Sequence, residues 1–321
     1  MQELQATLDC WLDANAGSWV AASDGSSGWL YPRGAHLGPA NHGADSLRWA
    51  PAGSCGAGGQ RWWPAGAWAQ PWNATRAGAL LARFGGVFFL GDSLMQQSYF
   101  SLASAFSDGY AESRAVPMQI GPSALGGAAR GVPVLFANRA DLHWRAGGDA
   151  AEGELAPPSR LTLVLNRGAH FAPDDVFVRE LDATLRALRE RLPDTLTVWR
   201  ATVPGSFRCG SEHGGGRAPT YASLAAALHN ASAWPYDWDK MLGQNALARA
   251  LIREHHPHVL VLDPAGPSML RPGARFSAYE GTDDDCLHWG MPGPPDMWNA
   301  ALIELFALVE QYAALSSPPR R

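Results

Sequence analysis

Short apolar runs alternate with longer amphipathic segments along most of the chain. Five runs have the length and composition of buried strands: 86–90, 132–137, 161–165, 195–202 and 258–262. Periodic apolar positions predict helices at 76–84, 94–106, 174–192, 240–256 and 296–312. Because buried apolar strands that alternate with helices are typical of parallel sheets, the pattern predicts an α/β fold. We expect a three-layer α/β/α sandwich with a mostly parallel sheet.

The beginning of the chain has a different pattern. Residues 1–72 are rich in Gly, Ser, Pro and Trp and show little periodicity. They are expected to form an irregular segment that packs on a main domain of residues 73–321. The Gly- and Pro-rich stretches 121–131, 146–159 and 204–219 are expected to be surface loops at the border of a functional site.

Composition narrows the class of protein. The chain has 321 residues, of which 46% are hydrophobic and 17% charged, with a formal net charge of -5. This balance is globular and lacks the basic surface that nucleic acid requires, so no nucleic-acid partner is expected. Met1–Leu4 lacks the basic start of a signal peptide, and no apolar stretch is long enough to cross a membrane. Either the chain is part of a membrane-anchored protein, or the assignment to the secretory pathway, which the cysteines and sequons below suggest, is wrong.

Cysteine usage points to an oxidising compartment. The four cysteines are Cys10, Cys55, Cys209 and Cys286, and none lies in a Cys-x-x-Cys or zinc-like spacing. An even number of widely spaced cysteines favours two disulfides, with three pairings possible. Because no zinc-like spacing is present, no metal site is predicted. The sequons Asn73-Ala74-Thr75 and Asn230-Ala231-Ser232 agree with a secretory lumen.

A serine follows the first predicted strand of the main domain. The strand 86–90 runs directly into Gly91-Asp92-Ser93, and a predicted helix begins at Leu94. Such a turn exposes a hydroxyl at the carboxyl end of a parallel sheet, where the helix N-terminus stabilises negative charge. Ser93 is therefore the predicted nucleophile of an acyl-transfer reaction.

A serine hydroxyl needs a base, and the base needs an orienting carboxylate. His288 and Asp285, in Asp285-Cys286-Leu287-His288, fit these roles because a short loop can direct both side chains into one pocket. The backbone N–H of Ser93 and the side-chain amide of Asn166 are predicted oxyanion donors. A glycine N–H from 126, 127 or 131 is a third candidate, while Asn166 could instead cap the following turn.

The order of these residues resembles the GDSL/SGNH hydrolase superfamily. More specifically, Asp285 to Asn299 resembles the C-terminal motif Asp-Cys-Ser-His-Trp-Cys-Leu-Pro-Gly-x-x-Asp-x-Trp-Asn of the plant trichome birefringence-like and PC-esterase family. Weaker resemblances are those of Gly91–Leu94 with Gln97, Asn166–His170, Trp199–Arg200 with Pro204–Gly205, and the lead-in segments around Cys10 and Cys55.

The resemblance implies an SGNH-like catalytic domain that O-acetylates a cell-wall polysaccharide in the Golgi lumen or after secretion. Ser93, Asp285 and His288 would form the triad, with no bound cofactor and with an acetyl donor such as acetyl-CoA as co-substrate. The expected oxyanion and substrate-binding residues are Gly91, Asp92, Asn166, Gly168, His170 and Arg200. The implied disulfides are Cys209–Cys286 and Cys10–Cys55.

Two departures concern specificity. Gly290 stands where plant members carry a cysteine, and Ser206 stands where relatives often place a histidine. The alternatives to a transferase are a carbohydrate acetyl esterase of the same fold and a glycan-binding protein with an inactive site. An intact triad argues against the last, but it cannot separate a transferase from an esterase.

Overall fold

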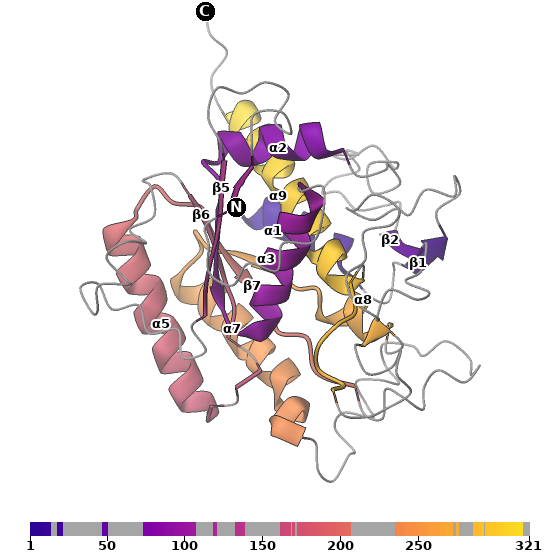
Figure 1. Ribbon diagram of the computed structural model, residues 1–321. Helices are drawn as coiled ribbons and strands as arrows, with labels where there is room; N and C mark the ends of the chain where they lie inside the picture. Colours follow the sequence, from indigo (N-terminus) through magenta and orange to yellow (C-terminus); the bar gives the residue numbers. More distant parts are fainter. Residues whose placement is uncertain are drawn as a thin grey trace, which may run out of the picture.

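In a computed structural model of the protein, the main elements form three layers, a central sheet with a layer of helices on each face (Figure 1). The described residues are 1–13, 18–21, 47–50, 73–106, 118–120, 132–138, 161–167, 169–170, 172–206, 235–271, 274–275, 285–291 and 293–316. Among these residues, no helix combines the length and the apolarity needed to span a bilayer.

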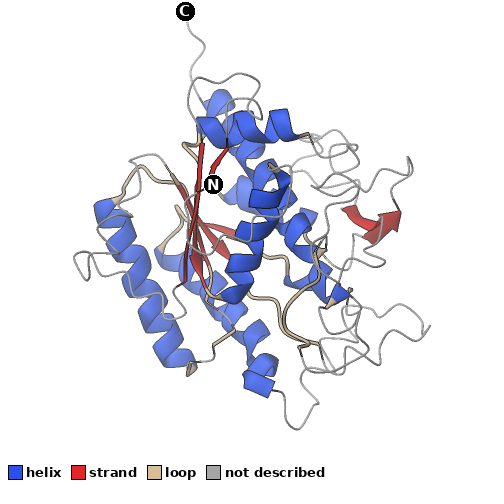
Figure 2. Ribbon diagram, in the orientation of Figure 1, coloured by secondary structure: helices blue, strands red, loops and turns tan. Residues whose placement is uncertain are grey.

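A six-stranded sheet forms the central layer (Figure 2). Its order is β4 (Met118–Ile120), β5 (Val132–Asn138), β3 (Val87–Gly91), β6 (Thr162–Leu165), β7 (Thr197–Arg200) and β8 (Leu260–Leu262). The strands β5, β3, β6, β7 and β8 are parallel, and β4 pairs antiparallel with β5 at one edge. The predicted α/β fold with a mostly parallel sheet is therefore confirmed, with β4 as an unpredicted edge strand.

Helices cover both faces of the sheet (Figure 1). One face carries α5 (Asp174–Arg191) and α7 (Met241–His255), and the other carries α1 (Gln2–Trp11), α2 (Ala74–Arg83), α3 (Ser93–Ala105) and α9 (Pro294–Ser316). The short helices η3 (Pro235–Lys240) and α8 (Ala265–Met269) respectively precede α7 and follow β8 in the chain. The strands β1 (Ser18–Ala21) and β2 (Leu47–Ala50) form a separate two-stranded antiparallel sheet.

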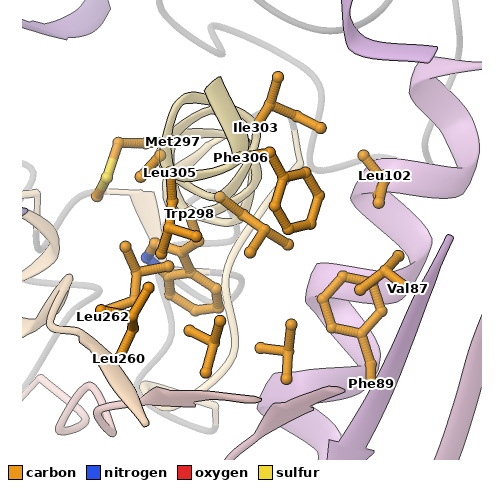
Figure 3. Packing of buried hydrophobic residues seen from close by; sticks show 14 of the residues in the cluster. Val87, Phe89, Leu102, Leu260, Leu262, Met297, Trp298, Ile303, Leu305 and Phe306 are labelled. Atoms are coloured by element: carbon orange, nitrogen blue, oxygen red, sulfur yellow. The ribbon is translucent and has the colours of Figure 1, made fainter. Parts of the chain in front are cut away.

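The helix α9 contributes to the largest of the three hydrophobic clusters that the described residues form. Figure 3 shows its residues Trp298 and Phe306 between the strand β3 with α3 on one side and the strand β8 on the other. Both side chains are fully buried. Each such side chain contributes about 1.5–3 kcal/mol by burial, so α9 holds together elements that lie far apart in the sequence.

The expectation of an irregular N-terminal segment is wrong for residues 2–11, which form α1. Leu4, Leu8 and Trp11 follow helical spacing and are buried in the α9-side core. The Gln5 side-chain amide donates to the carbonyl of Val261 and accepts from its N–H, both at 2.8 Å. It thereby satisfies backbone groups of the edge strand β8, which would otherwise be open to another chain.

Two ion pairs join α2 to α9, and they differ in exposure. Arg76 makes a two-point contact with Glu304, whose side chain is 9% exposed, at 2.5 and 2.9 Å. Arg83 contacts Glu310 at 2.8 Å in a more exposed setting. We predict that Arg76→Ala lowers the free energy of unfolding by about 1 kcal/mol, because it leaves a largely buried carboxylate without its partner while solvent screens part of the effect.

Arg83→Ala is the matched control, and no measurable change is expected from it. Urea unfolding of both variants at neutral pH is the measurement. Equal effects of the two substitutions would contradict the role of burial.

Candidate active site

Ser93 lies at the carboxyl end of the central strand β3, as the first residue of α3. The backbone turns at Gly91, where an added Cβ would lie 2.7 Å from the carbonyl oxygen of Asn166. Only glycine allows β6 to approach so closely. The sheet and the helix therefore fix the position of the serine hydroxyl in a turn that tolerates no side chain at 91.

Asp92 lies beneath the serine and is fully buried. Its Oδ1 accepts from the N–H of Leu94 at 3.0 Å and caps α3, and its Oδ2 accepts from the N–H of Ala169 at 2.7 Å. A carboxylate at a helix N-terminus is stabilised by the unpaired N–H groups there. Asp92 thus ties the turn after β6 to the serine turn and has no exposed surface for a substrate.

The structure brings Ser93, His288 and Asp285 together. The Ser93 Oγ lies 2.8 Å from Nε2 of His288, and Nδ1 of His288 lies 2.9 Å from Oδ2 of Asp285. With the proton on Nδ1, the imidazole donates to Asp285 and accepts from the serine hydroxyl. This is the order of contacts that activates a serine by general-base catalysis.

Residues of its own loop keep the carboxylate of Asp285 ionised. Burial by itself would raise its pKa, but hydrogen bonds from the side chain and backbone of His288 and from the backbone of Leu287 lower the pKa to about 2. The carboxylate is therefore ionised at every pH at which the protein is expected to work. A fixed negative charge beside Nδ1 stabilises the imidazolium that forms when His288 takes a proton.

The histidine loop, residues 285–291, is anchored by Arg275, which is fully buried. Its guanidinium donates to the carbonyls of Leu287 and Pro204 and to Oγ of Ser206, and lies 3.4 Å from the ring centroid of Trp289. Arg275 was not predicted from the sequence, since an arginine in a Pro-Gly-Ala-Arg stretch gives no sign of burial. Stacking and carbonyl acceptors together hold this charge inside the protein.

The second half of the 285–299 motif docks α9 on α3. Oδ1 of Asp296 accepts from the Ser101 hydroxyl at 2.8 Å, and the Asn299 amide donates to Oγ of Ser101 and to the carbonyl of Ser98, both at 2.8 Å. Trp298 donates to Oγ of Ser268 at 2.8 Å. The motif therefore supplies the proposed acid–base pair at one end and, at the other, the contacts that fix the helix bearing Ser93.

Asn166 lies at the end of β6, as predicted, but its side chain turns away from the expected role. Both amide hydrogens are engaged, one with the carbonyl of Arg200 at 2.9 Å and one with Oγ1 of Thr202 at 3.0 Å. The residue is fully buried. In this geometry Asn166 joins the ends of β6 and β7, and it has no hydrogen left to donate to an oxyanion.

Arg200 was expected to contact substrate, and its placement does not allow this. The side chain is 1% exposed and stacks on Trp298, with 4.4 Å from its Cζ to the ring centroid. Burial lowers its pKa to about 10, and the negative charge of Asp92 partly opposes that shift. Its nitrogens make no hydrogen bond within the described part of the chain. Arg200 is thus a buried positive charge behind the serine turn.

The remaining expected residues divide into those that are placed and those outside the described residues. His170 is exposed, directly after Ala169 in the turn tied to Asp92. Cys10 and Cys286 are disulfide-bonded, and Asn73 is exposed and caps α2 through its Oδ1. The positions outside the described residues are Gly168, Cys55, Cys209, Asn230, the glycines 126, 127 and 131, and most of the predicted loops. The two disulfide pairings therefore stay predictions.

Fold and site geometry together define an SGNH-like α/β/α protein with a Ser–His–Asp arrangement at the carboxyl end of its sheet. Residues 169–305 match the family described as PC-Esterase, a GDSL/SGNH-like acyl-esterase family found in Pmr5 and Cas1p. The predicted resemblance is confirmed, and the matched region contains Asp285 and His288. Ser93 precedes it.

Two plant proteins show local similarity to the chain. Protein trichome birefringence-like 26 of Arabidopsis thaliana is 34% identical over 59 residues, and xyloglucan O-acetyltransferase 1 of the same plant is 39% identical over 56 residues. The matches span 15% and 14% of this chain and only 13% and 14% of the relatives. The similarity therefore extends to a short part of each relative.

The contact between His288 and Asp285 can be tested with the substitution Asp285→Asn. At neutral pH we expect kcat to fall by about 10²–10⁴-fold, because an amide cannot hold the imidazole in the right tautomer or stabilise its charged form. Steady-state hydrolysis of an acetyl ester is the measurement. A variant with nearly unchanged kcat would contradict the assignment of Asp285.

The same substitution should also change how the free energy of unfolding depends on pH under acidic conditions. Because folding depresses the pKa of Asp285 from 3.8 to about 2, its ionised form stabilises the fold above pH 3.8. This contribution is lost as pH falls towards 2. We expect the difference in unfolding free energy between wild type and Asp285→Asn to shrink over this window, as measured by denaturant unfolding at several pH values.

Proposed function

We propose that the protein is an O-acetyltransferase that moves an acetyl group through an acyl-serine at Ser93 onto a hydroxyl of a cell-wall polysaccharide. The observation that carries this proposal is the continuous contact from Ser93 through His288 to Asp285. The PC-Esterase match and the similarity to a xyloglucan O-acetyltransferase support the substrate class.

In the first half-reaction, Nε2 of His288 takes the proton of Ser93 as its Oγ attacks the acetyl carbonyl of the donor, for which acetyl-CoA is a candidate. The tetrahedral oxyanion is stabilised by the Ser93 backbone N–H at the N-terminus of α3. When the intermediate collapses, His288 returns the proton to the leaving group of the donor. Acetyl-Ser93 remains.

In the second half-reaction, a sugar hydroxyl attacks acetyl-Ser93. His288 takes the proton of that hydroxyl and then returns it to Oγ of Ser93 as the new ester leaves. The charge of Asp285 stabilises the imidazolium in both half-reactions. The proton and the acetyl group are both accounted for over the two half-reactions, and the proposed mechanism therefore includes no bound cofactor or metal.

The proposed location is the Golgi lumen or the cell exterior. The disulfide-bonded state of Cys10 and Cys286 and the exposed sequon at Asn73 support an oxidising, glycosylating compartment. The proposed pairings remain Cys209–Cys286 and Cys10–Cys55. A bond at Cys286 would brace the histidine loop next to Asp285.

A carbohydrate acetyl esterase is the second candidate function. The side chains of His288 and Asp285 are 32% and 37% exposed, so water has access to the proposed base. Water attack on acetyl-Ser93 would then release acetate. A binding protein with an inactive site is less consistent with three catalytic groups in direct contact.

The first test of the proposal is Ser93→Ala. We expect ester turnover to fall to the background rate, because no other group forms the acyl-enzyme. Intact-protein mass spectrometry of the wild type with an activated acetyl ester should show one acetyl adduct that the variant lacks. Turnover retained by a folded Ser93→Ala protein would exclude Ser93 as the nucleophile.

A second experiment separates transferase from esterase. Wild-type protein is given an acetyl donor with and without cell-wall oligosaccharides, and both acetate and acetylated sugar are followed by mass spectrometry. A transferase should form acetylated sugar that requires Ser93, at the expense of acetate. Free acetate alone, at a rate unaffected by any oligosaccharide, would establish the esterase.

A further inference from the structure

One side chain connects the helix of the serine to the loop of the histidine without touching either reacting group. Gln97 lies four residues after Ser93 on α3, so both side chains leave the same face of the helix. Its Nε2 donates to the carbonyl of Trp289 at 2.8 Å, and its Oε1 accepts from the N–H of Trp289 at 3.2 Å. Trp289 directly follows His288 in the chain.

Two hydrogen bonds between Gln97 and Trp289 restrict the loop backbone more than a single bond would. A planar amide that both donates to and accepts from one backbone residue fixes that residue in distance and in rotation. The contact therefore determines how far the backbone of the histidine loop lies from α3. The position of His288 follows, since only one peptide bond separates it from Trp289.

The opposite side of Trp289 is also held. Arg275 stacks on its indole ring, residues 275 and 289 form a β-bridge, and the N–H of Gly290 donates to the carbonyl of Ala274 at 2.9 Å. These contacts tie the histidine loop to residues 274–275, but not to the helix of the serine. Among the described residues, Gln97 supplies the hydrogen bonds that join the backbone of this loop to the helix of Ser93.

The fold does not depend on Gln97 for the position of α3. The polar contacts of Asp296 and Asn299 with Ser98 and Ser101 already dock α3 on α9. Leu94 and Leu102 on α3 are fully buried in the core. Loss of the Gln97 amide should therefore leave the helix in place and release the loop alone.

We infer that Gln97 is a positioning residue that sets the separation between the Ser93 hydroxyl and the His288 imidazole. The inference rests on the proposed acyl-serine function and adds to it a residue whose role is geometric. A base displaced by about 1 Å from its working distance can cost about 100-fold in rate. Substrate binding is not expected to change, because Gln97 faces the loop backbone.

The test is Gln97→Met, which keeps the length of the side chain and removes both hydrogen bonds. The matched control is Gln96→Met, because Gln96 is the neighbouring half-buried glutamine and its side chain makes no hydrogen bond with any described residue. For acetyl ester hydrolysis, we expect Gln97→Met to lower kcat by about 10–100-fold with KM unchanged within about twofold. Gln96→Met should keep kcat within about twofold.

Labelling of Ser93 by a fluorophosphonate probe gives an independent readout, since it reports activation of the serine without an acceptor. The labelling rate of Gln97→Met should fall in parallel with kcat, while its melting temperature stays close to that of Gln96→Met. A second variant, Gln97→Glu, keeps the acceptor for the Trp289 N–H and places a carboxylate against the Trp289 carbonyl. It should also lose kcat, and it decides the question if Gln97→Met does not fold.

Equal kcat and labelling rates in wild type and Gln97→Met would overturn the positioning role while the triad assignment stands. A rise in KM alone, with kcat unchanged, would overturn the positioning role as well. If wild-type protein itself shows neither labelling at Ser93 nor ester turnover, the proposed function fails and the inference fails with it. The wild-type measurement therefore distinguishes the two failures.

Discussion

The site depends on one hydrogen bond, from the Ser93 hydroxyl to Nε2 of His288, between residues 195 positions apart in the chain. A bond of 2.8 Å between distant segments persists only if each segment is held by other contacts. The strand β3 and the buried α9 core hold the serine side, and Arg275 holds the histidine side. The fold therefore keeps the serine turn and the histidine loop in contact.

A layer of buried polar groups lies directly under the site. Asp92 binds the turn after β6, Asn166 joins the ends of β6 and β7, and Asn245 on α7 accepts from the N–H and donates to the carbonyl of Thr202. These bonds join the segments that follow β3, β6 and β7 to one another and to α7. Because buried hydrogen bonds of this kind restrict the segments that they join, the layer preorganises the serine turn before any substrate binds.

The succession of strands and helices along the chain was predictable, because buried parallel strands and amphipathic helices leave clear periodicity. The expected geometry, with Ser93 next to His288 and His288 next to Asp285, is also found, while the catalytic roles of the three residues stay predictions. The roles of Asn166 and Arg200 could not be predicted, because sequence places a residue at a strand end without showing which way its side chain faces. Helix α1 was missed since Leu4, Leu8 and Trp11 precede a stretch whose Gly and Pro content dominates the local composition.

The choice between transfer and hydrolysis is not made by the triad, since His288 can take a proton from a sugar hydroxyl or from water. The imidazole is about one-third exposed, so its position alone does not exclude water. A bound hydroxyl held at the right distance and angle can have an effective molarity of about 10⁵–10⁸ M. An acceptor that is well oriented therefore outcompetes bulk water even at an open site. On this argument, transferase activity depends on the residues that orient the sugar, and the triad's own geometry sets only the rate of the shared acyl-enzyme steps.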